Sequence, residues 1–447
     1  MGSTNSPPSQ TTPTTPTTTT TTTPPTTTTI DPSTLPPSTS PHLILTHPTP
    51  SERERTARQT YPTWGFALAE ADYLAREAYL TTVPLARDGG ITHWILTVEG
   101  LPGDGRPILS SCESLRKRAV VASSAAAAAA ANGKGEKGGE LGGGEGGSVR
   151  LVEGVAHGIG SVFTEPGFRG RGYASRMMKE VGERLRRWQA GAAVAAPAVA
   201  LAGEEAAVEK ERSLFSVLYS DIGKTFYAKH GWAPFESSHV SFQPVEGAVV
   251  GGKGQVAKAL GYHELAELCA VDEKLLRADL ERRGDGKPHV AILPELDALL
   301  WHLMREDYMT KAIFGKTPTV RGAVAGEPGK RVWAVWMRGY YGGLKKLEGN
   351  VLHVLRVVVE DPNQPDEELV AGFRSIVQIA QHEAAEWKTQ DIQIWNPDPK
   401  LRGLVEKCGI ESEFVKRDKD SIASLRWYGE EPTAEVDWVA NEKYAWC

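Results

Sequence analysis

The sequence predicts a mixed α/β fold made of two successive halves. Apolar runs of strand length alternate with amphipathic stretches of helical period through most of the 447 residues. A similar order of elements, strands followed by a helix, a strand and a short helix, occurs before and after about residue 250. Length alone allows two or three domains, at roughly 100–200 residues each. We therefore expect one domain over residues 44–250 and a second over residues 251–447.

The first 43 residues are expected to form a disordered tail outside both domains. Residues 1–50 contain 20 Thr, 12 Pro and one charged side chain, Asp31. Such a stretch buries too little apolar surface to offset the entropy lost on ordering. Two further low-complexity segments, at about 122–148 and 190–211, are rich in Ala and Gly and are expected to be inserts in the first domain.

Composition argues against several classes of protein. The formal net charge of −6 argues against nucleic acid or an anionic membrane as a partner. No run of 18 apolar residues and no secretory signal is visible, so we expect a cytoplasmic protein. The four cysteines are far apart and form no CxxC pair, which argues against a metal site and a disulfide framework. The sequence indicates no oligomeric state.

The elements of the first half follow in order along the chain. A strand is expected at His93–Val98, and Ile108–Glu113 with Ala119–Val121 forms either one strand or two strands broken at a basic kink. Further strands are expected at Val155–Thr164 and Leu214–Tyr219, and helices at Ala174–Trp188 and Thr225–His230. This pattern implies a mixed sheet with at least one βαβ crossover.

The strongest chemical signal is a glycine-rich turn between the third of these strands and the first helix. Residues 165–174 read Glu-Pro-Gly-Phe-Arg-Gly-Arg-Gly-Tyr-Ala. Gly170 and Gly172 allow a tight turn and let a phosphate approach the backbone. The backbone N–H groups and the positive dipole at a helix N-terminus favour an anion, and neighbouring arginines add charge. The turn therefore predicts a pyrophosphate site, although it is neither a Walker A loop nor a Rossmann fingerprint.

Two motifs in this half resemble those of the Gcn5-related N-acetyltransferases (GNAT). The R/Q-x-x-G-x-G/A signature of that family is matched by Arg169, Gly170, Arg171, Gly172, Tyr173 and Ala174. The family's F-Y-x-x-x-G-F segment is matched by Phe226–Trp232, which also follows a strand. The resemblance implies that residues 169–174 hold the pyrophosphate of acetyl-CoA. It also implies that strand N–H groups near Val162 and Phe163 anchor the pantetheine arm and polarise the thioester. Ser220 stands where the family often has Asn, and we include it among the cofactor-binding residues.

The same resemblance implies direct transfer of the acetyl group to an amine, without a nucleophilic cysteine or a metal. Tyr227, with an ordinary pKa of about 10, would be neutral and would protonate the leaving thiolate. The general base is left open. Glu165 at the strand end is one candidate, and Glu113 and His93 on neighbouring strands are others.

The second half is expected to be a degenerate GNAT-like domain that shapes the substrate pocket. Strands are expected at Val332–Tyr340, Val351–Val359 and Asp391–Trp395. A long helix is expected at Asp366–Lys388, and a short helix that ends at Gly409 follows the last strand. Residues 363–368 take the place of the phosphate loop, but they are acidic and contain no glycine. The position that matches Tyr227 is about Val405.

The order of tail, insert-bearing first half and aromatic-rich second half is similar to that of the fungal lysine N6-acetyltransferases of lysine catabolism, over about residues 44–447. The resemblance implies free L-lysine as the acceptor. Another small amine or a protein lysine is the alternative substrate, and a non-catalytic acyl-CoA-binding scaffold is the alternative of another class. Some two-lobed relatives use their terminal carboxylate as the base, which makes Cys447 a further candidate.

Overall fold

The computed structural model describes residues 32–124, 149–190, 212–247 and 256–446. Most of the predicted tail, most of both predicted inserts and Cys447 lie outside these ranges. Residues 36–447 form one compact unit. The tail predicted to reach residue 43 is therefore too long, because residues 36–43 belong to this unit. The strand before the first insert continues to Ser124, close to the expected start of the insert at about residue 122.

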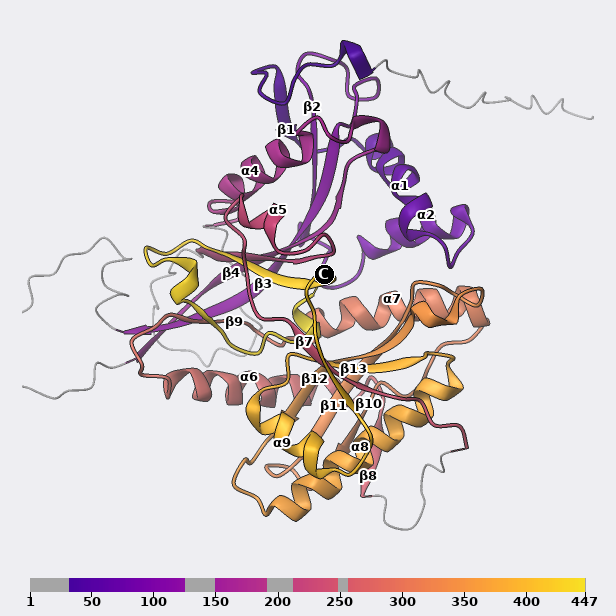
Figure 1. Cartoon of the computed structure of the whole chain (residues 1–447), viewed down its shortest axis with the longest axis vertical. Helices are drawn as coiled ribbons and strands as arrows, with labels where there is room; N and C mark the ends of the chain where they lie inside the picture. The colour runs from indigo at the N-terminus through magenta and orange to yellow at the C-terminus, as the bar shows by residue number, and fades with distance from the viewer. Residues whose placement is uncertain (1–31, 125–148, 191–211, 248–255, 447) are drawn as a thin grey trace, which may run out of the picture. The chain divides into compact units, whose positions relative to one another are not determined.

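The first of two mixed sheets holds nine of the described strands (Figure 1). Seven pair side by side in the order β1 (Leu43–Thr46), β2 (Ile91–Val98), β3 (Ser110–Ser124), β4 (Val149–Phe163), β5 (Ser213–Ser220), β15 (Ile422–Trp427) and β6 (Ala233–Pro234). β9 (His289–Ile292) pairs with the second half of β3, and β16 (Asp437–Trp438) pairs with β9. β3 is one long strand, which is the first of the two alternatives that the sequence left open for this stretch.

The second sheet has seven described strands. Their order is β14 (Glu413–Lys416), β7 (Ser238–Phe242), β13 (Asp391–Trp395), β12 (Asn350–Val359), β11 (Val332–Tyr340), β10 (Gly322–Ala325) and β8 (Ala257–Leu260). The structure places β11 and β13 at the predicted residues: β11 is a buried and mostly apolar run, and β13 alternates polar and apolar residues.

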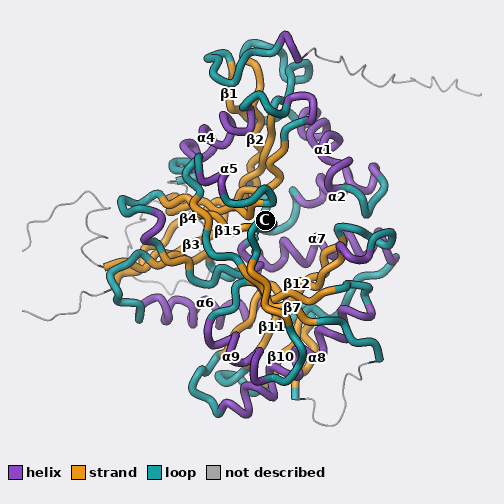
Figure 2. Tube along the Cα trace, in the orientation of Figure 1, coloured by secondary structure: helices purple, strands orange, loops and turns teal. Residues whose placement is uncertain are grey.

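The two sheets exchange strands across residue 250. β7 comes from the first half of the chain but pairs with β13 and β14 in the second sheet. β9, β15 and β16 come from the second half but belong to the first sheet, where β15 pairs with β5 and β6. Figure 2 shows β15 in the same part of the molecule as β3 and β4 of that sheet. The expected boundary at residue 250 therefore does not separate the two sheets.

The described helices pack on the sheets and between them. Their bounds are α1 (Pro50–Trp64), α2 (Glu70–Leu80), α4 (Tyr173–Leu185), α5 (Thr225–Ala228), α6 (Leu265–Glu281), α7 (Leu296–Phe314), α8 (Asp366–Glu386) and α9 (Pro399–Lys407). Figure 1 shows α4 and α5 on one side of β1 and β2, with α1 and α2 on the other. α8 lies against β10 and β11, and α7 lies against β11 and α2. None of the described helices is long and apolar enough to cross a membrane.

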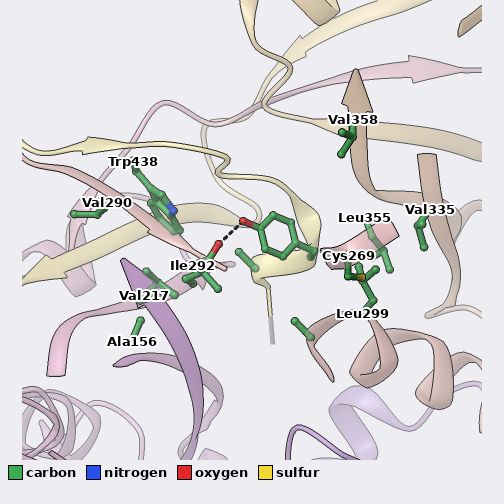
Figure 3. Packing of buried hydrophobic residues seen from close by; sticks show 14 of the residues in the cluster. Ala156, Val217, Cys269, Val290, Ile292, Leu299, Val335, Leu355, Val358 and Trp438 are labelled. Carbon is green, nitrogen blue, oxygen red and sulfur yellow. Dashed lines mark hydrogen bonds between the residues drawn. The ribbon is translucent and has the colours of Figure 1, made fainter. Parts of the chain in front are cut away.

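One apolar cluster joins the two sheets (Figure 3). Val217 of β5 and Ile292 of β9 belong to it together with Val335 of β11 and Leu355 of β12, and all four are fully buried. Tyr444 closes the cluster near the end of the chain, where its hydroxyl donates to the Ile292 carbonyl over 2.6 Å. Burying a side chain of this size contributes about 1.5–3 kcal/mol, so the shared core ties the sheets into one unit.

Candidate functional site

The glycine-rich turn lies where the sequence predicts it, between β4 and α4. After β4 ends at Phe163, a 3₁₀ turn (Pro166–Phe168) leads to α4, which begins at Tyr173. Gly170 and Gly172 have φ values of 76° and 82°, a left-handed conformation that glycine adopts without strain. Gly172 caps the helix and supplies no side-chain acceptor for the N–H groups of the first turn. The N–H groups of the first turn thus receive no hydrogen bond from a capping side chain at Gly172.

The side chains of this turn are held by local contacts. Arg169 Nε donates to the Thr164 carbonyl over 2.9 Å, and its guanidinium lies 5.6 Å from the centre of the Phe163 ring. Ala174 follows in the first helical turn, and Arg176 pairs with Glu180 one turn further along α4. The turn's own contribution to an anion site is therefore mainly its backbone and the helix dipole.

Residues 36–40 run across the start of α4. The Tyr173 hydroxyl donates to the Pro36 carbonyl over 2.6 Å, and Arg176 Nη1 donates to the Ser38 carbonyl over 3.0 Å. A Cβ atom placed on Gly172 would lie 2.6 Å from Ser38 Oγ. These bonds satisfy backbone carbonyls of residues 36–40, which explains why this part of the predicted tail is ordered.

The end of β4, just before the turn, extends beyond its pairing with β5. β4 pairs in parallel with β5 from Val155 to Ile159, and β4 then continues to Phe163 with only β3 as its partner strand. Its pairing with β3 shifts register just after Gly160, and Ser161 has a φ of 53°. A non-glycine residue in this conformation marks a bulge. Val162 and Phe163 therefore lie beyond the β4–β5 ladder, which leaves backbone groups at this end of β4 without a β5 partner.

A cavity of about 460 Å³ opens beside this bulge. Its walls come from α1, α2, β2, β3 and β4. The aromatic lining residues are Trp64, Tyr73 and Trp94, the acidic ones are Glu54, Glu77 and Glu113, and His93, Cys112 and Ser161 also contribute. Sequence reasoning found Glu113 and His93 but missed Ser161, Trp64 and Tyr73, because only the folded chain brings α1 and α2 against the strands.

Glu113 and His93 meet at the cavity wall. They face each other across the β2–β3 ladder, and His93 Nε2 lies 3.3 Å from Glu113 Oε1. Ser161 Oγ donates to Glu113 Oε2 over 2.9 Å. Burial raises the pKa of Glu113, but the hydrogen bonds from His93 and Ser161 and the charges of His93 and Arg76 outweigh it and leave the pKa below its usual value. Glu113 is therefore an ionised carboxylate at neutral pH.

Glu165, the other expected carboxylate, has different surroundings. Its Oε2 accepts a hydrogen bond from Gln59 of α1 over 3.1 Å. It is not among the residues that line the cavity. The structure thus brings two of the three base candidates together and leaves Glu165 outside the cavity lining.

Tyr227 lies on the short helix α5 and is 8% exposed. Burial raises its pKa above the usual value, with smaller contributions from Cys112 and Asp221. Its hydroxyl is therefore neutral and keeps its proton.

Ser220, at the end of β5, is fully buried and donates to the Gly223 carbonyl over 2.6 Å, so its hydroxyl closes the turn that leads to α5.

The end of the chain approaches the same sheet. Lys117 of β3 donates to the carbonyls of Ala445 and Trp446 over 2.9 and 3.2 Å. Cys447 itself, the candidate that would act through its terminal carboxylate, lies outside the described residues. Lys117 is four residues along β3 from Glu113, on the same face.

Residues 360–365, which the structure describes between β12 and α8, form no equivalent glycine-rich turn. The long helix α8 begins at Asp366, and three acidic residues occupy the first turn, where a phosphate would be repelled. Val405, the position that matches Tyr227, is a buried apolar residue of α9. In the described part of the chain, no three His, Cys, Asp or Glu side chains are grouped so that they could hold a metal ion.

Comparisons with known proteins agree with this picture. Residues 239–447 match a family model described as the LYC1 GNAT-like C-terminal domain. A protein of Yarrowia lipolytica named lysine acetyltransferase is 24% identical over 325 residues, which cover 65% of this chain and 71% of the relative.

Two solved structures are similar at a lower level. One is a conserved protein of unknown function from Enterococcus faecalis, described as a probable N-acyltransferase, with a TM-score of 0.44, 12% identity and coverage of 86% of this chain and 72% of that one. The other is a GCN5-related N-acetyltransferase from Kribbella flavida, with a TM-score of 0.43, 14% identity and coverage of 86% and 71%. Likenesses this loose do not bear on function. The family match confirms the GNAT-like character predicted for the second half, and residues 239–447 are similar to the GNAT-like C-terminal domain that the model describes.

Proposed function

We propose that the chain is an N-acetyltransferase that moves the acetyl group of acetyl-CoA directly to a primary amine, and that the acceptor is the ε-amine of free L-lysine. The observation that carries the proposal is the Glu113–His93 pair in a cavity beside the bulged end of β4. The name of the Yarrowia lipolytica relative supports lysine as the acceptor. Such an enzyme would act in the cytoplasm on a small-molecule amine, with no nucleic acid or membrane as partner.

The residues of the glycine-rich turn fit the diphosphate of acetyl-CoA. Gly170 and Gly172 present backbone donors without side chains, and a Cβ atom on Gly172 would clash with Ser38 Oγ at 2.6 Å. Residues 169–174 would hold the diphosphate, and the backbone of Val162 and Phe163, beyond the β4–β5 ladder, would hold the pantetheine arm. Acetyl-CoA supplies the activated acetyl group as a thioester.

The acceptor needs a base, because a lysine ε-ammonium has an ordinary pKa of about 10.4 and attacks only after losing a proton. We assign this role to Glu113, whose carboxylate is ionised and faces the cavity, rather than to Glu165, which is bonded to Gln59. His93 and Ser161 orient the carboxylate. The terminal carboxylate of Cys447 is the alternative base.

The rest of the cavity suits a cation on an apolar stem. Glu54 and Glu77 add negative charge to its lining, which favours the ammonium form of an incoming amine. Trp64 and Tyr73 offer aromatic surface to methylene groups and to the cation itself. Tyr227, buried and neutral, would give its proton to the departing thiolate.

The test is an acceptor panel with the purified full-length chain and acetyl-CoA, following release of free thiol. L-lysine should release thiol in proportion to the amine consumed, whereas L-norleucine, which lacks the ε-amine, should release none. Release with lysine-containing peptides but not with free lysine would favour a protein substrate. Binding of acetyl-CoA without thiol release from any amine would favour a non-catalytic acyl-CoA-binding scaffold.

A further inference from the structure

A second group of polar side chains surrounds the indole of Trp395, at the end of β13. The guanidinium carbon of Arg417 lies 3.8 Å from the centre of that ring, and the His353 ring lies 5.8 Å from it. His239 faces Trp395 across the β7–β13 ladder. We call these four residues the Trp395 cluster. None of them lines the cavity that holds Glu113 and His93.

The cluster contains buried polar atoms without partners. Across residues 32–124, 149–190, 212–247 and 256–446, all three guanidinium nitrogens of Arg417 are buried and lack a hydrogen-bond acceptor. Nδ1 of His239 and Nδ1 of His353 are buried and unpartnered as well, and these side chains are 9% and 5% exposed. A buried donor without an acceptor loses its hydration and gains nothing in return, so native proteins seldom keep one.

Other buried arginines of this chain are paired. Arg321 and Arg338 both bind Glu306, and Arg356 binds Asp272. Arg417 departs from this pattern, although burying a guanidinium is costly unless an anion accompanies it. An arginine that the fold buries and leaves unpaired therefore points to an anion that is not part of the described chain.

The nearby acidic side chains are engaged elsewhere. Asp391 accepts hydrogen bonds from Ser241 and Gln393, and Asp221 accepts one from the backbone N–H of Ser421. Lys443 adds a further positive charge, with Nζ 4.0 Å from the centre of the Trp395 ring. Burial lowers the pKa of Arg417 to about 10, so it stays a cation at neutral pH, and burial lowers the pKa of both histidines. The cluster is thus positive overall, with neutral imidazoles beside one guanidinium.

We propose that the Trp395 cluster binds a carboxylate. The N–H groups along one edge of the guanidinium can donate two parallel hydrogen bonds to the two oxygens of a carboxylate. The Trp395 indole covers the face of the guanidinium and holds the group in a fixed orientation. The carboxylate is either the α-carboxylate of an amino acid or that of another small organic acid.

The test is isothermal titration of the full-length chain with sodium acetate at neutral pH, with acetamide as the uncharged probe. Wild type should bind acetate and not acetamide. Arg417→Lys keeps a cation but loses the fork, so acetate binding should weaken about tenfold or more. Arg417→Gln should abolish it. The matched control is Arg402→Gln, which removes an exposed arginine stacked 4.4 Å from the Phe414 ring and should leave acetate binding unchanged.

Competition between acetate and amino acids for the Trp395 cluster shows which molecule carries the carboxylate. Displacement of acetate by L-lysine but not by L-lysinamide would identify the α-carboxylate of an amino acid, and displacement by neither would identify a separate organic acid; either result upholds the site. Equal binding of acetate and acetamide, or unchanged acetate binding in both Arg417 variants, would overturn it. The readout needs no acetyl transfer, so it can fail while the proposed activity stands.

Discussion

Ser161 donates a 2.9 Å hydrogen bond to Glu113 from a backbone conformation, φ 53°, that residues other than glycine seldom adopt. Ser161 thus has two roles. It lies in the bulge of the β3–β4 pairing, and it makes the hydrogen bond that holds the Glu113 carboxylate. Strand geometry and the orientation of the proposed base are coupled at this point.

Replacing Ser161 tests that coupling. Ser161→Ala and Ser161→Gly both remove the hydroxyl that lowers the pKa of Glu113, so this pKa should rise in both variants. Because the base works in its ionised form, the acidic limb of the kcat/KM profile should move to higher pH. The two variants should differ only in stability, with glycine more stable by about 1 kcal/mol because it accepts the positive φ. Identical pH profiles for wild type and both variants would exclude a role for Ser161 in holding the base.

Removing the carboxylate tests the base itself. Glu113→Gln keeps the shape of the side chain but cannot accept the proton, so kcat should fall about 10²–10⁴-fold while the KM for acetyl-CoA stays unchanged. The matched variant is Glu165→Gln, which alters a carboxylate bonded to Gln59 outside the cavity lining. Steady-state kinetics of the two variants decide between them. A larger loss in Glu165→Gln than in Glu113→Gln would reverse the assignment.

The glycine-rich turn offers a second matched pair. Gly172→Ala puts a Cβ at φ 82°, 2.6 Å from Ser38 Oγ, whereas a Cβ on Gly167 meets nothing within 4 Å. Calorimetric titration with CoA should therefore show binding weakened about tenfold or more in Gly172→Ala, a loss of about 1.4 kcal/mol, and little change in Gly167→Ala. Equal affinities for the two variants would mean that the diphosphate binds elsewhere.

Tyr227 should act on the leaving group and not on binding. Tyr227→Phe removes only a hydroxyl, so the affinity for acetyl-CoA should be kept while kcat falls about 100-fold or more. Burial keeps the pKa of this hydroxyl above its usual value, so deprotonation of Tyr227 should not limit the rate on the alkaline side of the wild-type profile near pH 10. Turnover equal to wild type in Tyr227→Phe would remove the residue from the mechanism.

Local patterns in the sequence were enough to predict several of the strands and helices and the glycine-rich turn between β4 and α4. β11 and β13 have the predicted ends, since β11 is mostly apolar and β13 alternates polar and apolar residues. Gly170 and Gly172 have the conformation that only glycine adopts easily. The exchange of β7 and β15 between sheets was not predicted, because pairing partners depend on distant parts of the chain.

The candidate site was predictable only in part. Glu113 and His93 could be named as candidates, but their contact follows from the β2–β3 register, which local sequence does not define. Nothing near Ser161 signals its positive φ. Arg417 likewise stands in a charged stretch, residues 416–420, that reads as solvent-exposed, and only the folded chain brings it onto Trp395.

The most direct test of the central claim is the position of the acetyl group on the product. Full-length chain, acetyl-CoA and free L-lysine are incubated, and the product is identified by fragmentation mass spectrometry alongside a count of thiol released. The proposed mechanism predicts N6-acetyl-L-lysine in amounts equal to the thiol, and loss of both in Glu113→Gln. Acetylation at the α-amine, or no acetyl-lysine at all while acetyl-CoA still binds, would contradict it.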